Sequence, residues 1–274
     1  MSIVSRGDTG ILVTQSGNTY QFRFPMRRDS ICQLHTLPPV AQVAMCGNND
    51  TGKHYAVVCR KGTMWTWGAN NRGQTGNGVM PAVSIVPYQL SPEWFAHQYV
   101  ASVSCGSECT FAVTDVGRVY SFGSGVYGQL GHGRSGFEAT KSVPTLIEGL
   151  EGVVVAMLAT DENHSVCVSN DGRVWSWGYN SCRQLGIEGV DAEYVSVPTP
   201  VTGLDKESDV VFASTSSVHS TVVTTKGTVL AWGSNKYGQC GIGSTMIVHT
   251  PTLVVFRDNE TPTSSEGQPP DIAH

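Results

Sequence analysis

Two glycine-rich segments have the spacing of phosphate-binding motifs. Gly123 to Gly128 spells GxGxxG, and Gly47 to Lys53 spells GxxxxGK. Such loops bind phosphate groups when they lead into the N-terminus of a helix. A β-type run, Tyr55 to Cys59, follows the second segment, and no helical pattern follows the first. Three sister segments carry Asn where the first has Gly125, and Asn and Gly both tolerate turns. We therefore interpret both segments as loops and expect no cofactor.

Four residues of metal-ligand type recur at an interval of 55 residues: His54, Cys109, His164 and His219. Imidazole and thiolate groups are zinc ligands, but they must converge to about 2.0–2.3 Å from the metal. Equal spacing places them on separate repeat units, so we expect a structural role and no metal. The sequence also lacks HExxH, GxSxG and any nucleophile–base grouping. We therefore predict no catalytic residue and no enzyme.

An aromatic–glycine pair recurs at the same interval of 55 residues, which indicates a repeat architecture. A fifth, degenerate copy opens the chain, with Ile11 to Gln15, Gly17 and Thr19 to Phe22. The four good pairs are Trp67 and Gly68, Phe122 and Gly123, Trp177 and Gly178, and Trp232 and Gly233. We expect these aromatic side chains to pack between neighbouring repeats.

One repeat reads as four short strands. Val100 to Ser104, Thr110 to Thr114 and Val119 to Phe122 are apolar and β-prone, and a turn containing Gly117 joins the second to the third. A glycine-rich loop and then Pro144 lead to a strand at Thr145 to Ile147, and proline at a strand start suits an outer edge. The third strand is apolar on both faces, as in a sheet covered on both sides. The sequence predicts an all-β protein, a β-propeller of about five four-stranded blades.

The repeated stretches GTMWTWGANNRGQTGNG, GRVYSFGSGVYGQLGHG, GRVWSWGYNSCRQLGIEG and GTVLAWGSNKYGQCGIG resemble the repeat of the regulator of chromosome condensation family. The resemblance implies a propeller over residues 1–256, followed by a Pro/Ser/Thr/Glu-rich tail at 257–274. Members usually form seven blades, so five blades imply either a smaller closed ring or an open arc. We favour the closed ring, with Ser2 to Ser5 pairing beside Leu253 to Phe256 as a clasp.

Composition narrows the classes of partner. The chain has 274 residues, a net charge of −5 and no basic cluster, which argues against direct nucleic-acid binding. It has no apolar run of 18 residues, so we expect no membrane insertion. Its eight cysteines include no CxxC pair, which favours reduced thiols. We expect an intracellular, cytoplasmic protein.

These features favour a non-catalytic protein–protein interaction propeller, a subunit or adaptor in a larger assembly. Trp94 and Phe95 depart from the repeat and are candidate interface anchors, or alternatively plugs of the propeller rim. The insertion Arg134 to Lys141 is a further departure at which a partner could dock.

The resemblance implies an alternative function, guanine-nucleotide exchange on a Ran-like small GTPase. Exchange would use an acidic loop face, and the candidate residues for it are Asp161, Glu162, His164 and Asp171.

Overall fold

The computed structural model describes residues 2–25, 30–47, 52–80, 83–204 and 208–256. Within them the chain forms five four-stranded antiparallel sheets, here called blades 1 to 5, each built from consecutive strands. The strands of blades 1 and 2 are β1 (Ser2–Arg6), β2 (Thr9–Val13), β3 (Thr19–Arg23), β4 (Ile31–Gln33), β5 (Val40–Cys46), β6 (His54–Cys59), β7 (Met64–Gly68) and β8 (Ser84–Gln89).

Blades 3 to 5 repeat this arrangement. Their strands are β9 (Val100–Cys105), β10 (Cys109–Thr114), β11 (Val119–Gly123), β12 (Lys141–Leu146), β13 (Val155–Asp161), β14 (His164–Ser169), β15 (Val174–Tyr179), β16 (Tyr194–Pro200), β17 (Val210–Thr215), β18 (His219–Thr224), β19 (Val229–Gly233) and β20 (Val248–Leu253). Three short 3-10 helices, η2 (Pro92–Phe95), η3 (Phe137–Ala139) and η4 (Glu148–Leu150), lie in the connections. The predicted all-β five-bladed propeller is confirmed.

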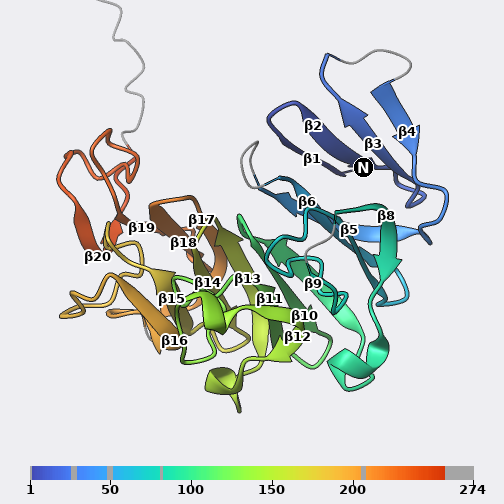
Figure 1. The fold of residues 1–274 in the computed structure, drawn as a ribbon. Helices are drawn as coiled ribbons and strands as arrows, with labels where there is room; N and C mark the ends of the chain where they lie inside the picture. The colour runs from blue at the N-terminus through green and yellow to red at the C-terminus, as the bar shows by residue number, and fades with distance from the viewer. Residues whose placement is uncertain (1, 26–29, 48–51, 81–82, 205–207, 257–274) are drawn as a thin grey trace, which may run out of the picture.

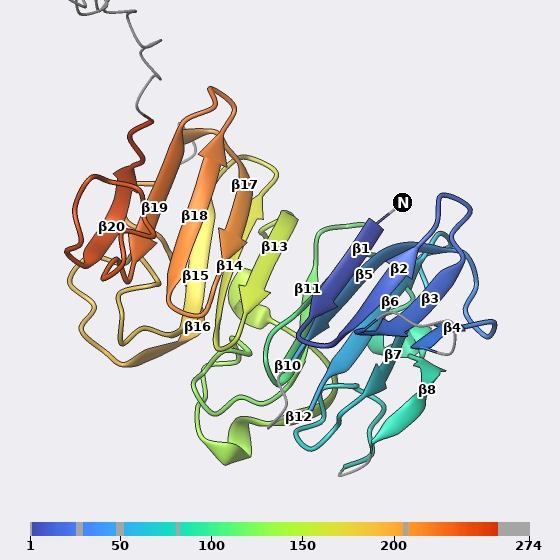
Figure 2. The same cartoon turned by 90° about the horizontal axis from the view of Figure 1, so that it is seen from above.

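In every blade the strands follow chain order from the axis outwards. The first strands β1, β5, β9, β13 and β17 contact one another in series, and the fourth strands lie on the rim (Figure 2). Each rim strand of blades 2 to 5 contains proline, which lacks the N–H that a further strand would need. The predicted outer position of these strands is therefore confirmed. The tail at 257–274 lies outside the described residues.

The blades follow an arc, with blade 1 and blade 5 at its two ends (Figure 1). The favoured closed ring and its clasp are wrong, and the open arc, the other alternative, is observed: β1 pairs with β2 inside blade 1, with Ser2 opposite Val13, and β20 pairs with β19. The reason is local. Only Gly7 and Asp8 separate β1 from β2, and Gly7 has a φ of +61°, so the chain turns straight back into a hairpin.

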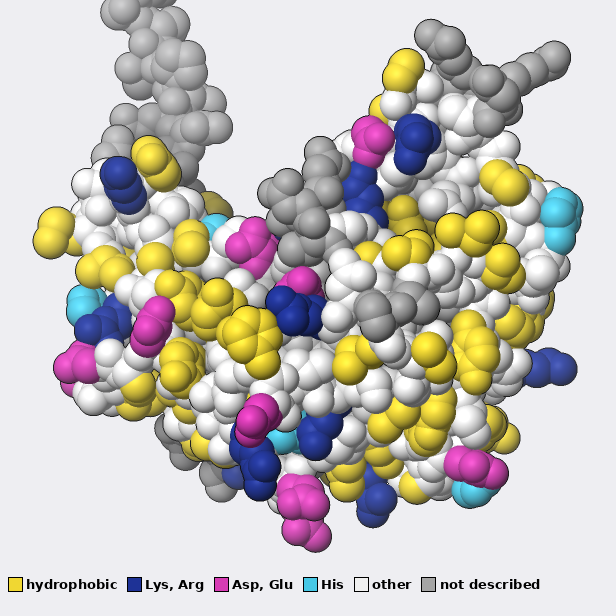
Figure 3. Space-filling view, viewed as in Figure 1, with side chains coloured by type: hydrophobic (Ala, Val, Ile, Leu, Met, Phe, Trp, Pro, Cys, Tyr) yellow, Lys and Arg dark blue, Asp and Glu magenta, His cyan; other side chains and the backbone are white. Residues whose placement is uncertain are grey.

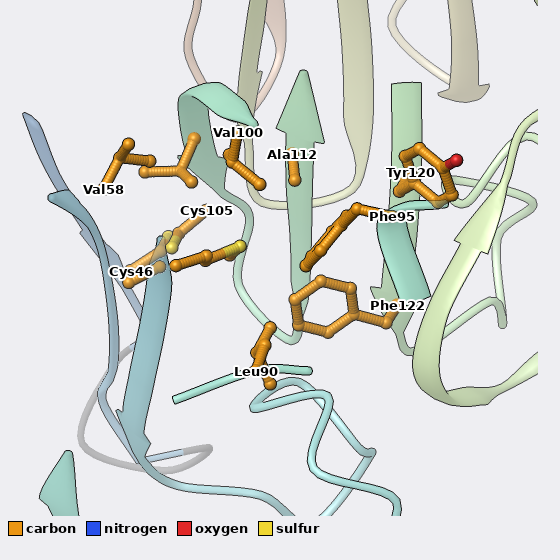
Figure 4. Close-up of a cluster of buried hydrophobic side chains, with 12 residues drawn as sticks. Cys46, Val58, Leu90, Phe95, Val100, Cys105, Ala112, Tyr120 and Phe122 are labelled. Atoms are coloured by element: carbon orange, nitrogen blue, oxygen red, sulfur yellow. The ribbon is translucent and has the colours of Figure 1, made fainter. Parts of the chain in front are cut away.

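The core consists of clusters at the seams between successive blades. The four aromatic side chains of the repeat, Trp67, Phe122, Trp177 and Trp232, are at most 2% exposed, and each joins a different cluster. Figure 4 shows the cluster between blades 2 and 3, where Cys46 and Val58 of blade 2 lie on the side of Val100 and Cys105 of blade 3. Burial of a side chain of this size contributes about 1.5–3 kcal/mol, so the seams hold the blades in sequence.

The residue after each aromatic side chain must be glycine, because the backbone of the neighbouring strand lies very close to it. Gly178 has a φ of +103°, and a Cβ there would lie 2.4 Å from the carbonyl oxygen of Asn163. Only glycine fits this position, because it accepts the conformation and leaves room for the neighbouring strand.

Candidate partner-binding face

The described turns and loops that follow the first and third strands lie at one end of the blades, which we call the loop face. It comprises the turns between first and second strands, such as 106–108 and 162–163, and the long loops after third strands, such as 124–140 and 180–193. Antiparallel pairing brings these segments together, because the first strand ends where the third strand ends. The tight turns between second and third strands lie at the opposite end.

Ion pairs on the loop face join different blades. Arg6 of blade 1 contacts the carboxylate of Asp161 in blade 4 at 2.8 Å and that of Glu162 at 3.8 Å. The Cys46 thiol of blade 2 lies 3.6 Å from the same Asp161 carboxylate. The backbone N–H of Ser107 in blade 3 donates to the Glu162 carbonyl at 3.1 Å. Four blades therefore meet at Asp161 and Glu162.

The Cys46 thiol at this junction is protonated. Burial raises its pKa to about 12, so it stays neutral near pH 7 and lacks the thiolate that nucleophilic chemistry needs. Cys46 therefore acts as a small packing residue rather than a reactive group.

A second cluster on the loop face combines arginine with aromatic side chains. The Arg72 guanidinium lies 5.0 Å from the ring centroid of Phe137 and 3.8 Å from the Glu108 carboxylate. The rings of Tyr127 and Tyr179 lie 5.2 Å apart. We call Arg72, Glu108, Tyr127, Phe137 and Tyr179 the aromatic patch.

One loop connects the two halves of the aromatic patch. Residues 124–140 carry both Tyr127 and Phe137, and the N–H of Gly136 donates to the Val126 carbonyl at 2.9 Å. Phe137 is 68% exposed and Tyr127 is 38% exposed. Arginine and tyrosine are residue types that dominate binding energy at protein interfaces. Figure 3 also shows the surface hollowed between the two ends of the arc, with acidic and basic side chains on the floor of the hollow.

Phe95, a predicted interface anchor, lies in the interior. Its side chain is 2% exposed and packs edge-on against Tyr120, with ring centroids 5.3 Å apart (Figure 4). Trp94 is partly buried against the same cluster. The anchor prediction is wrong for Phe95, because η2 turns its ring inward. The burial of Phe95 agrees with the alternative interpretation, a plug of the rim, and the role of Trp94 as an anchor or a plug stays a prediction.

His164, a predicted partner-binding residue, is also buried. Its Nε2 lies 2.8 Å from the Ser220 hydroxyl of blade 5, and that hydroxyl donates to the Gln184 carbonyl at 2.8 Å. Because the single hydroxyl proton is used there, Nε2 must donate to Ser220. Burial lowers the pKa of His164 to about 4. The imidazole is neutral and closes a seam, so it cannot contact a partner.

His54 has the same role one seam earlier. Its Nε2 lies 3.0 Å from the Thr110 hydroxyl of blade 3, and that hydroxyl donates to the Gln74 carbonyl at 2.8 Å. Burial lowers the pKa of His54 to about 4 as well. The described residues contain no group of three or more His, Cys, Asp or Glu that could hold a metal.

The four candidate residues for an acidic loop face do not form one site. Asp161 and Glu162 lie on the loop face, whereas Asp171 lies in the turn after β14 and forms an ion pair with Arg173 at 2.9 Å. The six residues of β14 span roughly 20 Å, so its two ends belong to opposite faces. Only Asp161 and Glu162 remain together.

The described residues of the two glycine-rich segments contact neighbouring blades, and residues 48–51 of the second segment lie outside the described part of the chain. Gly128 of the GxGxxG segment approaches the backbone of Ser196 in blade 4, and a Cβ there would lie 2.8 Å from the Ser196 Cα. Lys53 of the GxxxxGK segment forms an ion pair with Asp8 of blade 1. Neither segment leads into a helix in the described chain.

Comparison with known proteins identifies the repeat. The model of the regulator of chromosome condensation (RCC1) repeat matches residues 61–113, 116–168, 171–223 and 226–265. The chain belongs to the RCC1 repeat family. As in the sequence pattern, blade 1 precedes these four matched repeats.

Similar proteins are larger than this chain. The probable E3 ubiquitin-protein ligase HERC6 of Homo sapiens is 32% identical over 226 residues, which are 82% of this chain and 21% of HERC6. The crystal structure of human WBSCR16 superimposes with a TM-score of 0.76 at 22% identity, covering 93% of this chain and 67% of that protein. Prp20p of Saccharomyces cerevisiae, characterised for its binding to Gsp1p and histones, gives a TM-score of 0.74 at 20% identity, covering 93% and 62%. The two structural likenesses show the same fold.

The aromatic patch was not found as a unit by sequence reasoning. Phe137 lies inside the insertion Arg134 to Lys141, which the departure from the RCC1 repeat pattern does indicate. Arg72 occupies an ordinary repeat position, and nothing local shows that it will meet residues 36 and 65 positions away. No helix among the described residues has the length and apolar character to cross a membrane.

Proposed function

We propose that this chain is a non-catalytic adaptor that binds a protein partner through the aromatic patch on its loop face. The observation that carries the proposal is a half-buried arginine held between an aromatic ring and a carboxylate from different segments. The chain as a whole is poor in charge, with 14% charged residues, so such a cluster is a distinctive surface.

The patch is suited to recognition because its side chains are already ordered. Arg72 is fixed by Phe137 and Glu108, and the loop of Phe137 is tied by its own backbone hydrogen bond at Gly136. Ordering a flexible side chain on binding costs about 0.5–1.5 kcal/mol, and a pre-ordered patch avoids most of that cost. A partner with an exposed carboxylate beside apolar side chains would complement Arg72 and Phe137.

The test compares single substitutions on opposite faces. Partners of the full chain would be captured by crosslinking and identified by mass spectrometry, and the affinity of the main partner would then be measured. We expect Phe137→Ala and Arg72→Ala each to weaken binding at least about tenfold. The control is Asp171→Ala on the opposite end, which should bind normally. Normal binding by both patch variants would refute the proposal.

Guanine-nucleotide exchange is a second candidate. It is supported by Asp161 and Glu162, which lie together on the loop face, and by the fold shared with Prp20p, which binds Gsp1p. Release of labelled GDP from a panel of Ran-type GTPases would be measured with and without the chain. Faster release that Glu162→Lys abolishes supports exchange. Unchanged release across the panel leaves the adaptor as the function.

A further inference from the structure

The seam between blades 4 and 5 is built from three parts. Between blades 4 and 5, Val166 and Val168 on β14 face Val222 on β18. The His164 ring donates to Ser220 across the seam. The long loop of blade 4 covers the aromatic residue of blade 5, since the Trp232 indole N–H donates to the Gln184 carbonyl at 2.8 Å.

Blade 5 carries the same parts on its outward face, where they are uncovered. Thr221 and Val223 on β18, which correspond to Val166 and Val168, are only half-buried. Phe212 on β17 points to the same side, because it is directly opposite Val223, and it is 49% exposed.

The long loop of blade 5 also lacks a neighbour. Gly128 in blade 3 approaches Ser196 of the next blade, and a Cβ there would lie 2.8 Å away. At the equivalent Gly238, and at Gly243, a Cβ would meet nothing within 4 Å. Loop 234–247 therefore has the shape of a covering loop and covers no rim strand.

Blade 1 presents a matching face at the other end of the arc. Cross-strand pairing places Ile3, Leu12 and Tyr20 side by side on it, together with Ile31 opposite Phe22. Ile3 is 58% exposed and Ile31 is 45% exposed. Ile31 lies on β4, the rim strand that a covering loop of a preceding blade would contact.

We propose that the outward face of blade 5 binds the outward face of blade 1 in a second copy of this chain. The contact continues the series of seams already present in the molecule, with the same side of one blade against the same side of the next. One seam of this kind covers all four exposed parts: the face and loop of blade 5, and the face and rim strand of blade 1. This self-association is separate from the partner site on the loop face.

The geometry fixes the form and strength of the association. The two faces are different surfaces, so the contact is head-to-tail and leaves one free face at each end. A four-stranded sheet with strands of about five residues covers roughly 300 Å². Even with the loop added, the interface is in the size range of weak, transient protein contacts. We therefore expect reversible association in the micromolar range.

The experiment is sedimentation velocity of the 274-residue chain from roughly 1 to 200 μM. We expect the average mass to rise with concentration. Phe212→Asp and Ile3→Asp should each abolish the rise, because each places a carboxylate on one of the two apolar faces. The matched control is Ile85→Asp on β8, which is 83% exposed but lies away from both faces, and it should associate like the wild type.

Mixing the two face variants tests the head-to-tail form. Phe212→Asp keeps an intact blade 1 face and Ile3→Asp keeps an intact blade 5 face, so the mixture should give 1:1 dimers that grow no further. Equal melting temperatures would show that all variants fold. The proposal is overturned if the wild type stays monomeric at every concentration, if Ile85→Asp also abolishes association, or if the mixture stays monomeric.

Discussion

Blades 4 and 5 have nearly the same sequence pattern and very different exposure. Each begins its second strand with His-Ser and carries Trp-Gly at the end of its third strand. All six residues of β14 are buried, whereas β18 alternates between buried and half-buried residues. The difference arises from the neighbour, since blade 5 lies against β14 and no blade of this chain covers the far side of β18 (Figure 2). The repeat sequence is therefore sufficient to form a blade, but whether the face of that blade is buried depends on the neighbouring blade.

The largest loss of stability should come from substituting glycines that share a positive φ but differ in how closely their neighbours approach. Gly178→Val should lower the free energy of unfolding by about 4 kcal/mol, because the new side chain meets the Asn163 carbonyl at a positive φ. Gly238→Val, also at positive φ but in open space, should cost about 2 kcal/mol from backbone strain. Urea denaturation measures both. Equal losses would mean that the close approach is unimportant.

Truncating equivalent valines should cost more stability in blade 4 than in blade 5, and this difference should be smaller than that between the glycines. Val168 in β14 is 2% exposed and packs in the seam, so Val168→Ala should cost about 2 kcal/mol. Val223 in β18 is half-buried on the uncovered face, so Val223→Ala should cost under about 1 kcal/mol. The measurement is again denaturation, at a protein concentration where the chain is monomeric. A larger loss at Val223 would show that its face is covered.

Acid should destabilise the seam of blade 4 through His164. Its pKa is about 4 in the folded protein, below the ordinary value, so the unfolded chain binds the proton first as the pH falls. Stability is therefore fully present above about pH 6.5 and is lost towards pH 4, at up to about 1.4 kcal/mol per pH unit. His164→Gln should flatten the curve of melting temperature against pH. Burial also lowers the pKa of His219, but this side chain is only half-buried, so His219→Gln should flatten the curve less.

The smallest effect should come from the contact that ties blade 1 to blade 4. Arg6 and Asp161 are partly exposed, at 36% and 22% of their side chains, so solvent screens their attraction. Arg6→Met should lower the free energy of unfolding by about 1 kcal/mol or less. The loss should shrink in high salt. A loss of several kcal/mol would mean that this ion pair, rather than the seams, holds the arc together.

Local sequence was sufficient for the strands and turns. The predicted strands at Val100 to Ser104 and Thr110 to Thr114 match β9 and β10 within one residue, and Gly117 forms the expected turn with a φ of +79°. Periodicity and glycine chemistry act over a few residues, so the sequence displays them directly. The repeat also supports each predicted strand and turn several times, because the same pattern returns at a fixed interval.

Features that depend on which segments meet could not be predicted in the same way. The sequence favours a clasp for Ser2 to Ser5, but the two-residue turn at Gly7 pairs these residues with β2 inside blade 1. Phe95 could be an anchor or a plug until η2 placed its ring against Tyr120. Asp171 shares a segment with Asp161 but lies at the other end of β14. Such features depend on contacts between segments that are distant in the sequence, and only the folded structure shows these contacts.

The prolines of the rim strands have a consequence for solubility. Pro87, Pro144, Pro198 and Pro251 each remove a donor from the outermost strand of a blade. Unprotected strand edges seed fibrillar aggregates by adding strands from other molecules. Because proline interrupts the hydrogen-bonding edge of the rim strand in four blades, strands of other molecules cannot easily add there. A concentrated solution of this chain should therefore stay free of amyloid-like deposits.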